Sequence, residues 1–265
     1  MNVVRVSSWT ELQERLFEGS WNPQIERFRP KAAYRGLSSA EYKLETTLQR
    51  MRGSYVQVER HMLRNFKKYA HRAVGLQDSI WHWIAVGKHY GLPTRLLDWS
   101  HSPFVAMHFA TANIEKMGED GVIWVVDYTR AHELLPSDLQ AQLRSEGASL
   151  FTTELLAKSL RGLDELAALA GDFVVFFEPP SIDDRIVNQF ALFSLLPDPR
   201  TTFDTWLEKH PEVWRKIVIP AALKWEIRDK LDQANITERV LFPGIDGLSR
   251  WLKRQYSPKF DDLGV

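Results

Sequence analysis

The stretch HYGLPTRLLDWSHSPFVAMHFA runs from His89 to Ala110 and places a polar, aromatic cluster directly before an apolar helix. Leu96 and Leu97 predict a short apolar strand, and Ser102 followed by Pro103 predicts the N-cap and first residue of the helix. The helix then carries one apolar face at three- and four-residue spacing, formed by Phe104, Val105, His108, Phe109 and Ala112. Because free N–H groups point outward at a helix N-terminus, the loop between this strand and this helix is predicted to bind an anion.

The composition limits the class of protein. The chain has 265 residues and a formal net charge of zero, so its overall charge does not favour nucleic acid or membrane as a partner. It has no cysteine, which excludes disulfides, thiolate zinc sites and cysteine nucleophiles. Its N-terminus does not resemble a secretory signal, and no apolar run approaches the roughly 18–20 residues of a membrane span. We therefore expect a cytoplasmic protein with no membrane partner.

Helical and strand patterns follow one another without a regular βα repeat, which favours an α+β fold. We expect a single domain over residues 1–265, with a mixed, mainly antiparallel sheet flanked by helices. Its core signatures lie at 30–128 and 173–196, and its C-terminal part, 221–257, is helical. The apolar patterns predict strands at 32–36, 121–128, 173–177, 190–196 and 214–219, and helices at 56–74, 221–234 and 244–255.

Four blocks of this sequence resemble the FRG domain family. The first is Ala33-Tyr34-Arg35-Gly36-Leu37, which carries the aromatic-Arg-Gly motif that gives the family its name. The second is the run from His89 to Ser100, where Lys88 stands at the position that is usually glutamine. The third, Arg185-Ile186-Val187-Asn188-Gln189 leading to Phe193, resembles a strand of the family, and the fourth is Leu241–Leu248. In bacteria, this resemblance implies a toxin or an anti-phage effector.

The order of the blocks also resembles ADP-ribosyltransferases of the arginine–serine–glutamate type. In those enzymes an aromatic-Arg strand, a serine-containing strand before a helix, and a glutamate at a strand start surround NAD. The resemblance implies an ADP-ribosyltransferase-like core and NAD as the substrate. Gln189 stands where the glutamate would be, and glutamine can orient a ribose but cannot act as a general base. Asp98 or Glu178 would then supply the missing carboxylate.

This resemblance assigns roles to individual residues. Arg35 would bind a phosphate or the nicotinamide ribose, Trp99 or Ser100 would line the nicotinamide pocket, and Gln189 would hydrogen-bond the ribose 2′-hydroxyl. The residues predicted to bind the nucleotide are Tyr34, Arg35, Gly36, His89, Arg95, Trp99 and Ser100. Those predicted to act in catalysis are Gln189, Arg35, Glu178 and Asp98. We expect no metal site, because the histidines are not arranged in a zinc motif.

The charged residues of the signature also allow a purely structural interpretation. Arg35, at a strand end before a glycine that would let a ligand approach, suits bidentate phosphate recognition, or it forms a buried pair with Asp98. In an extended segment Arg95, Leu97 and Trp99 share one face while Asp98 lies on the other, so Arg95 and Asp98 need separate partners. Arg35 and Lys88 are the candidates for Asp98.

The predicted helix at 56–74 carries a basic face, formed by Arg60, Arg64, Lys67, Lys68 and Arg72. Such a face is commonly just solvated, but beside a transferase pocket it would suit a nucleic-acid substrate. The sequence therefore leaves three hypotheses open. The protein is an NAD-dependent enzyme that modifies a macromolecule, a non-catalytic module that senses a nucleotide or a phage component, or a scaffold in which the motifs are structural.

Overall fold

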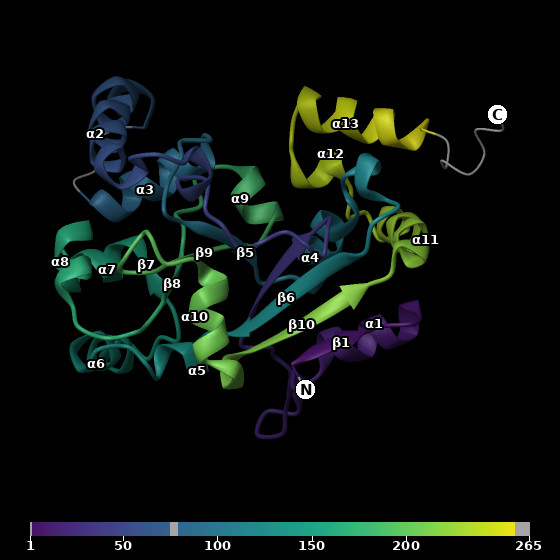
Figure 1. Cartoon of the computed structure of the whole chain (residues 1–265), viewed down its shortest axis with the longest axis horizontal. Helices are drawn as coiled ribbons and strands as arrows, with labels where there is room; N and C mark the ends of the chain where they lie inside the picture. The colour runs from purple at the N-terminus through teal and green to yellow at the C-terminus, as the bar shows by residue number, and fades with distance from the viewer. Residues whose placement is uncertain (1, 75–78, 258–265) are drawn as a thin grey trace.

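The centre of the protein is an eight-stranded mixed sheet with helices on both faces (Figure 1). The computed structural model describes residues 2–74 and 79–257. The strand order is β1-β10-β6-β4-β5-β9-β8-β7, in which β1/β10 and β7/β8 are parallel and the remaining neighbours are antiparallel. The predicted α+β class with a mainly antiparallel sheet is confirmed.

The strands follow the apolar runs of the sequence closely. Those of the main sheet are β1 (Val3–Arg5), β4 (Ala32–Leu37), β5 (Leu97–Ser100), β6 (Gly121–Asp127), β7 (Phe151–Thr152), β8 (Val175–Glu178), β9 (Ala191–Leu195) and β10 (Trp214–Ile219). A separate two-stranded ribbon pairs β2 (Trp21–Asn22) with β3 (Arg27–Phe28). Strand β10 has the predicted bounds, and β6 differs from its prediction by one residue.

The α-helices are α1 (Trp9–Phe17), α2 (Tyr55–Val74), α3 (Ile80–His89), α4 (Pro103–Thr111), α5 (Tyr128–His132), α6 (Ser137–Ser145), α7 (Thr153–Ser159), α8 (Leu163–Ala168), α9 (Asp184–Asn188), α10 (Phe203–Lys209), α11 (Ala221–Gln233), α12 (Glu238–Leu241) and α13 (Ile245–Gln255). The predicted C-terminal helices correspond to α11 and α13. Short 3₁₀ turns cover Gln49–Met51, Ile114–Lys116 and Pro211–Val213.

Strand β6 shows how one apolar run serves two cores. Ile123 and Val125 pack with α1, α4 and α11 on one face, whereas Val122, Trp124 and Val126 pack with α5 and α10 on the other. The sequence of a strand that is buried on both faces is a continuous apolar run, and β6 has such a sequence. A third cluster fills the space between α2, α3, α6, α7 and α8 and the β8/β9 end of the sheet.

Helix α4 begins as the sequence predicts. Ser102 is its N-cap and accepts a hydrogen bond from the backbone N–H of Val105 at 3.4 Å, and Pro103 occupies the first helical position. The helix lies so close to β4 that a Cβ added to Gly36 would fall 1.8 Å from the carbonyl oxygen of Ala106. The close approach of α4 therefore requires a glycine at this position, and the approach of a ligand to Gly36 stays a prediction.

Two segments differ from the predicted strands. Strand β5 starts at Leu97 and includes Asp98, Trp99 and Ser100, which were expected in the loop after it. Residues 185–189 were expected to be part of a strand, but residues 184–188 form helix α9, because Asp183 caps it by accepting a hydrogen bond from the N–H of Ile186. Gln189 is the C-terminal cap of that helix and not the first residue of a strand.

Candidate functional site

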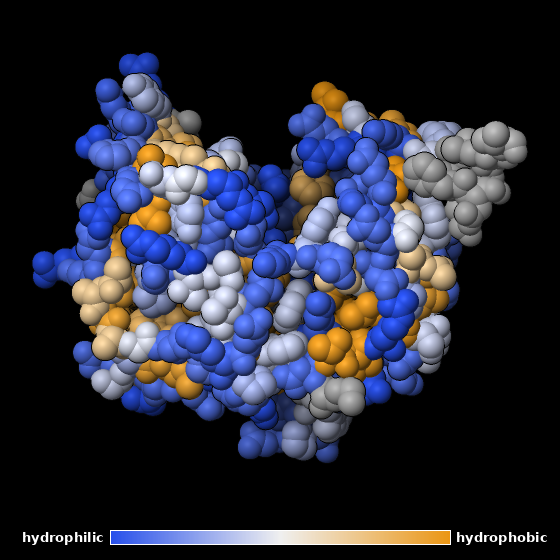
Figure 2. All heavy atoms as spheres, viewed as in Figure 1, coloured by the Kyte–Doolittle hydropathy of each residue, from blue (hydrophilic) through white to orange (hydrophobic). Residues whose placement is uncertain are grey.

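A cleft of about 970 Å³ opens where β4, β5 and β9 meet the C-terminal end of α3 and the short helix α9. Pro243, between α12 and α13, closes one side of it. In the space-filling view, the molecule is hollowed between the part that carries α2 and α3 and the part that carries α12 and α13 (Figure 2). The volume lies at the upper end of the range of small-molecule sites, about 300–1,000 Å³.

The sheet is open at the base of this cleft. Strands β4 and β5 share a single ladder pair, Tyr34 with Ser100, whereas β4 and β6 share six. Arg35 bridges the opening, since its Nη1 donates a hydrogen bond to the main-chain carbonyl of Asp98 at 2.6 Å. The guanidinium thus satisfies a carbonyl oxygen that the β4–β5 ladder leaves unpaired, while its own Nε is buried without a hydrogen-bond partner.

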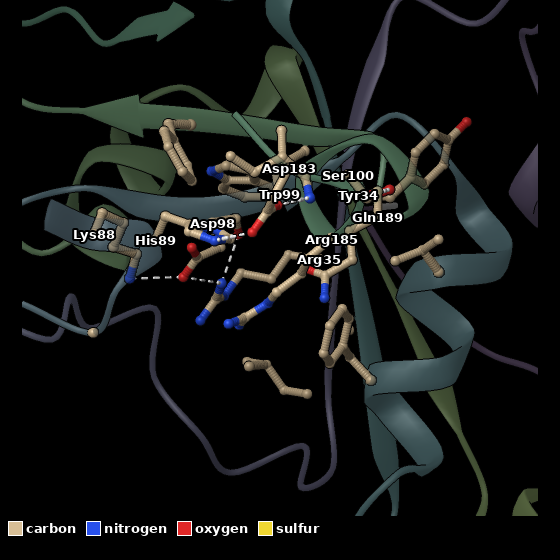
Figure 3. Close-up of a pocket in the computed structure, with 18 of the residues that line it drawn as sticks. Tyr34, Arg35, Lys88, His89, Asp98, Trp99, Ser100, Asp183, Arg185 and Gln189 are labelled. Carbon is tan, nitrogen blue, oxygen red and sulfur yellow. Dashed lines mark hydrogen bonds and ion pairs between the residues drawn. The ribbon is translucent and has the colours of Figure 1, made fainter. Parts of the chain in front are cut away.

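The carboxylate of Asp98 lies between cations (Figure 3). It is 2.8 Å from the Nζ of Lys88 and 3.8 Å from the Nη1 of Arg35. Its recessed position raises the pKa of the carboxyl, but the positive charges of Lys88 and Arg35 outweigh this effect, so the pKa of Asp98 is lowered. Lys88 and Arg35 are the two partners that the sequence offered for Asp98, and both contacts are confirmed.

Two further cations line the cleft without a carboxylate partner of their own. Within residues 2–74 and 79–257, neither Arg50 nor Arg185 forms an ion pair. Arg50 donates a hydrogen bond to the carbonyl of Glu45, and the guanidinium of Arg185 stacks on the ring of Phe242 at 5.1 Å. Leaving His89 aside, four cations and three carboxylates line the cleft, namely Arg35, Arg50, Lys88 and Arg185 with Asp98, Asp183 and Asp184.

His89 and Asp183 face each other across the cleft wall. The Nε2 of His89, at the end of α3, lies 2.6 Å from the Oδ2 of Asp183, just before α9. The exposed fraction of the His89 side chain is 8%, against 38% for Asp183. His89 was predicted as a site residue; Asp183 was not, because 94 positions separate the two in sequence.

Gln189 and Ser100 connect the cleft to the C-terminal helices. The hydroxyl of Ser100 donates to the main-chain carbonyl of Gln189 at 2.7 Å, and the side-chain amide nitrogen of Gln189 donates to the carbonyl of Leu241 at 2.7 Å. Asn188 makes the matching bond to Val240 at 2.9 Å. The amide oxygen of Gln189 remains as the acceptor that this side chain can offer to a ligand.

Comparison with known families bears on part of this cleft. Residues 30–119 match the model of the FRG domain. The chain contains an FRG domain. No curated protein and no solved structure matches the chain.

The FRG match covers the first wall of the cleft. It includes β4, α2, α3, β5 and α4, and with them Arg35, Lys88, His89 and Asp98. The second wall, formed by Asp183, Arg185 and Gln189, lies beyond residue 119. The FRG-matched range therefore contributes most of the residues that line the cleft, and segments outside the matched range contribute the rest.

Three residues that were predicted for the site have side chains that do not point into the cleft. Trp99 is among the residues that line the cleft, but its indole donates to the hydroxyl of Ser194 at 2.8 Å and packs among core aromatic rings, on the opposite face of β5 from Asp98. Arg95 is buried against Glu59, with its Nη2 2.5 Å from Oε2, and does not line the cleft. Nor does Glu178, whose carboxylate lies 3.3 Å from the Nε2 of His101.

Tyr34 and Ser100 line the cleft but are already engaged. The hydroxyl of Tyr34 donates to the carbonyl of Leu16 at 3.3 Å, and its ring belongs to the core beneath the sheet. The hydroxyl of Ser100 also accepts a hydrogen bond from the N–H of Ser102 at 2.9 Å, in addition to its bond to Gln189. Neither hydroxyl is available as a nucleophile in this arrangement.

The structure adds two aromatic residues that the sequence did not single out. Tyr42 and Tyr90 line the cleft with exposed fractions of 45% and 66%. Tyr90 lies within the signature run, next to His89, and its ring packs edge-on against that imidazole at 4.9 Å. Their positions could have been suspected only from their neighbours in sequence, since no spacing rule distinguishes them from surface tyrosines.

The basic face of α2 lies at a separate, smaller hollow of about 480 Å³. Arg60, Arg64 and Lys67 line it together with residues of α3 and α8, and none of its lining residues is shared with the larger cleft. Arg60 pairs with Asp164, and the ammonium of Lys67 lies 5.9 Å from the ring centre of Trp83. Part of this basic face is therefore neutralised by contacts within the protein.

Membrane-spanning helices and clusters of metal ligands are both absent from residues 2–74 and 79–257. In this part of the chain, no helix combines the length and the apolar character needed to cross a membrane. Nor does it bring three or more His, Asp or Glu side chains together in a way that could hold a metal ion.

Proposed function

We propose that the cleft binds a phosphate-bearing nucleotide, NAD, and that the protein transfers ADP-ribose from it to a macromolecule or to water. The observation that carries this proposal is the convergence of cations in the cleft, two of which, Arg50 and Arg185, have no carboxylate partner in the described chain. Guanidinium groups recognise phosphate oxygens in a bidentate manner, and a guanidinium without a carboxylate partner needs no ion pair to be broken first.

The remaining features of the cleft fit a nucleotide. Tyr42 and Tyr90 are exposed at the cleft and could stack on a base or on nicotinamide, the role first assigned to Trp99. The free amide oxygen of Gln189 can accept a hydrogen bond from a ribose hydroxyl. Cleavage of the nicotinamide–ribose bond passes through a cationic, oxocarbenium-like state, which the carboxylates of Asp98, Asp183 and Asp184 would stabilise.

For the acceptor, we propose a nucleic acid held along the exposed outer face of α2. Arg64, Lys68 and Arg72 lie on this helix and form no ion pair within the described chain. Contacts of this kind to phosphates make binding depend strongly on salt. A role as a bacterial toxin or an anti-phage effector is the setting that the resemblance to FRG proteins implies for such a reaction.

One observation favours a second function, a sensor that binds a nucleotide or a phage component without turning it over. Asp98 is held by two cations, Asp183 faces His89, and Glu178 lies outside the cleft. Gln189 carries no charge. A cleft whose acidic groups are mostly neutralised would stabilise a developing positive charge less well than one with a free carboxylate.

The test is incubation of the purified protein with NAD labelled on the adenylate, alone and with DNA, RNA or cell lysate. The enzyme predicts free ADP-ribose or a labelled macromolecule, lost in Arg185→Ala and Arg35→Ala but kept in Arg200→Ala, a control arginine whose contact with Asp198 is on the surface. Binding of NAD without any product would support the sensor. If the protein neither binds NAD nor forms a product from it, both the enzyme and a sensor of NAD are refuted.

A further inference from the structure

The contact between His89 and Asp183 joins the two walls of the cleft (Figure 3). His89 comes from the FRG-matched wall and is the last residue of α3, whereas Asp183 comes from the second wall and is the N-cap of α9. Their Nε2 and Oδ2 atoms are 2.6 Å apart. Two electronegative atoms at this distance need a proton between them, which places the imidazole proton on Nε2.

The carboxylate of Asp183 is held in place because its other oxygen, Oδ1, is hydrogen-bonded to the backbone. Oδ1 accepts a hydrogen bond from the backbone N–H of Ile186 at 3.1 Å and so caps α9, while Oδ2 faces the imidazole. The ring of Tyr90 packs edge-on against His89. Since the carboxylate is fixed by the helix cap and the imidazole is fixed by the carboxylate, the orientation of the ring is set before any ligand binds.

With Nε2 turned to Asp183, the nitrogen left for a ligand is Nδ1. In the part of the chain that the structure describes, no protein group hydrogen-bonds to Nδ1. A neutral imidazole whose one nitrogen faces a carboxylate presents a lone pair on the other, which is the arrangement of a general base. The chain thus contains a base–carboxylate pair of which only the histidine was expected at the site.

We propose that His89 is the general base that activates the acceptor; this inference rests on the proposed NAD-dependent function. The acceptor, a hydroxyl, an amine or water, forms a bond from its O or N to C1′ of the ribose. The C1′–N bond of NAD breaks, and its electron pair leaves with nicotinamide, which becomes neutral. The acceptor proton passes to Nδ1 of His89, and the positive charge on the imidazolium is stabilised by Asp183.

Other candidate bases in the cleft fit this role less well. The pKa of Asp98 is lowered by Lys88 and Arg35, which makes its carboxylate a weaker base. Gln189 has no basic atom, and Glu178 lies outside the cleft. His89 is the one described side chain of the cleft that combines a free basic nitrogen with an adjacent carboxylate.

The experiment compares His89→Ala, His89→Gln and Asp183→Asn with a matched control. His101→Gln alters a second histidine–carboxylate pair, at 3.3 Å from Glu178, that does not line the cleft. Three quantities are measured: the affinity for NAD, the rate of product formation, and the rate of product formation with added sodium azide. Azide is already an anion and attacks C1′ without giving up a proton.

We expect His89→Ala and His89→Gln to bind NAD with nearly wild-type affinity and to form product about 10²–10⁴-fold more slowly, as for the loss of a general base. Azide should restore much of that rate, with ADP-ribosyl azide as the product, because the step that needs the base is bypassed. His101→Gln should react at the wild-type rate. Asp183→Asn should be slowed and rescued in the same way.

Two results would overturn the inference while leaving the proposed function intact. The first is a His89 variant that turns NAD over at the wild-type rate. The second is a slow variant that azide does not rescue, which would make His89 a structural or binding residue. If the wild-type protein itself forms no product from NAD with or without azide, the proposed enzyme fails, and the general base fails with it.

Discussion

Arg95, two residues before β5, forms a buried ion pair with Glu59 of helix α2. The Nε of Arg95 donates to the Oε2 of Glu59 at 2.9 Å, and its backbone N–H donates to Oε1 at 3.2 Å. The exposed fractions of the two side chains are 8% and 2%. The guanidinium also donates to the carbonyl of Pro197 at 3.1 Å, so this pair fixes a helix, a strand and a turn relative to one another.

Removing one partner of this pair should be strongly destabilising. Arg95→Ala leaves the carboxylate of Glu59 buried without its cation, and we expect a loss of about 3–5 kcal/mol in the free energy of unfolding. Denaturant unfolding measures it. Arg200→Ala breaks a surface pair with Asp198 and should cost no more than about 1 kcal/mol. Equal losses in the two variants would show that the buried pair contributes no special stability.

Gly36 should tolerate no side chain. An added Cβ would meet the backbone of Ala106 and Ala110 in helix α4, at 1.8 and 2.7 Å, and neither backbone can move without lifting the helix off the sheet. We expect Gly36→Ala to lose about 3 kcal/mol or more of stability, or to fail to fold. Gly118→Ala is the matched control, since nothing lies within 4 Å of its added Cβ, and its melting temperature should stay near that of the wild type.

His132 should make the protein sensitive to acid. Its Nδ1 lies 3.0 Å from the carbonyl of Ser149, and its Nε2 accepts the backbone N–H of Phe176 at 2.9 Å, so the buried ring is neutral. Burial lowers the pKa of His132 to about 4, against an ordinary value of 6.5. Because the unfolded chain binds the proton more readily, this contribution to stability is complete above pH 6.5 and is lost as the pH falls towards 4.

The measurement for His132 is the free energy of unfolding between pH 7 and pH 4. The shift corresponds to a loss of about 3 kcal/mol over that range. His132→Asn should be less stable than the wild type at pH 7 but should show a shallower decline on acidification. His61→Gln, which alters an exposed histidine on α2, should keep the wild-type slope. A variant at position 132 with an unchanged slope would contradict the assignment.

Substitutions of Arg185 and Trp99 should have opposite effects on NAD affinity and on thermal stability. Arg185 is exposed and unpaired in the described chain, so Arg185→Ala should weaken NAD binding by about 10–100-fold, since a charged hydrogen bond contributes roughly 1.5–3 kcal/mol, and leave the melting temperature unchanged. Trp99→Phe should lower the melting temperature and leave the affinity for NAD unchanged, because the indole of Trp99 lies in the core and donates to Ser194. Calorimetric titration and thermal unfolding of both variants test this. A loss of affinity in Trp99→Phe would show that the indole takes part in NAD binding.

Several local elements can be predicted from the sequence alone. Ser102 and Pro103 start α4 where they were predicted to, the apolar run at β6 is a central strand, and the bounds of β10 were predicted correctly. Helix caps and apolar periodicity depend on residues within a few positions of each other, so a single sequence displays them. The alternation along β5 likewise showed that Trp99 and Asp98 point to opposite faces, although not which face was the core.

Which of the polar residues share a site is visible only in the folded protein. It paired Arg95 with Glu59 and His89 with Asp183, turned the indole of Trp99 into the core, and brought Tyr42 and Tyr90 to the cleft. The partner of a charged side chain depends on which distant segments pack together and on how far burial makes an unpaired charge unfavourable. Neither the packing of distant segments nor the burial of a charge can be predicted from the spacing of residues along the chain.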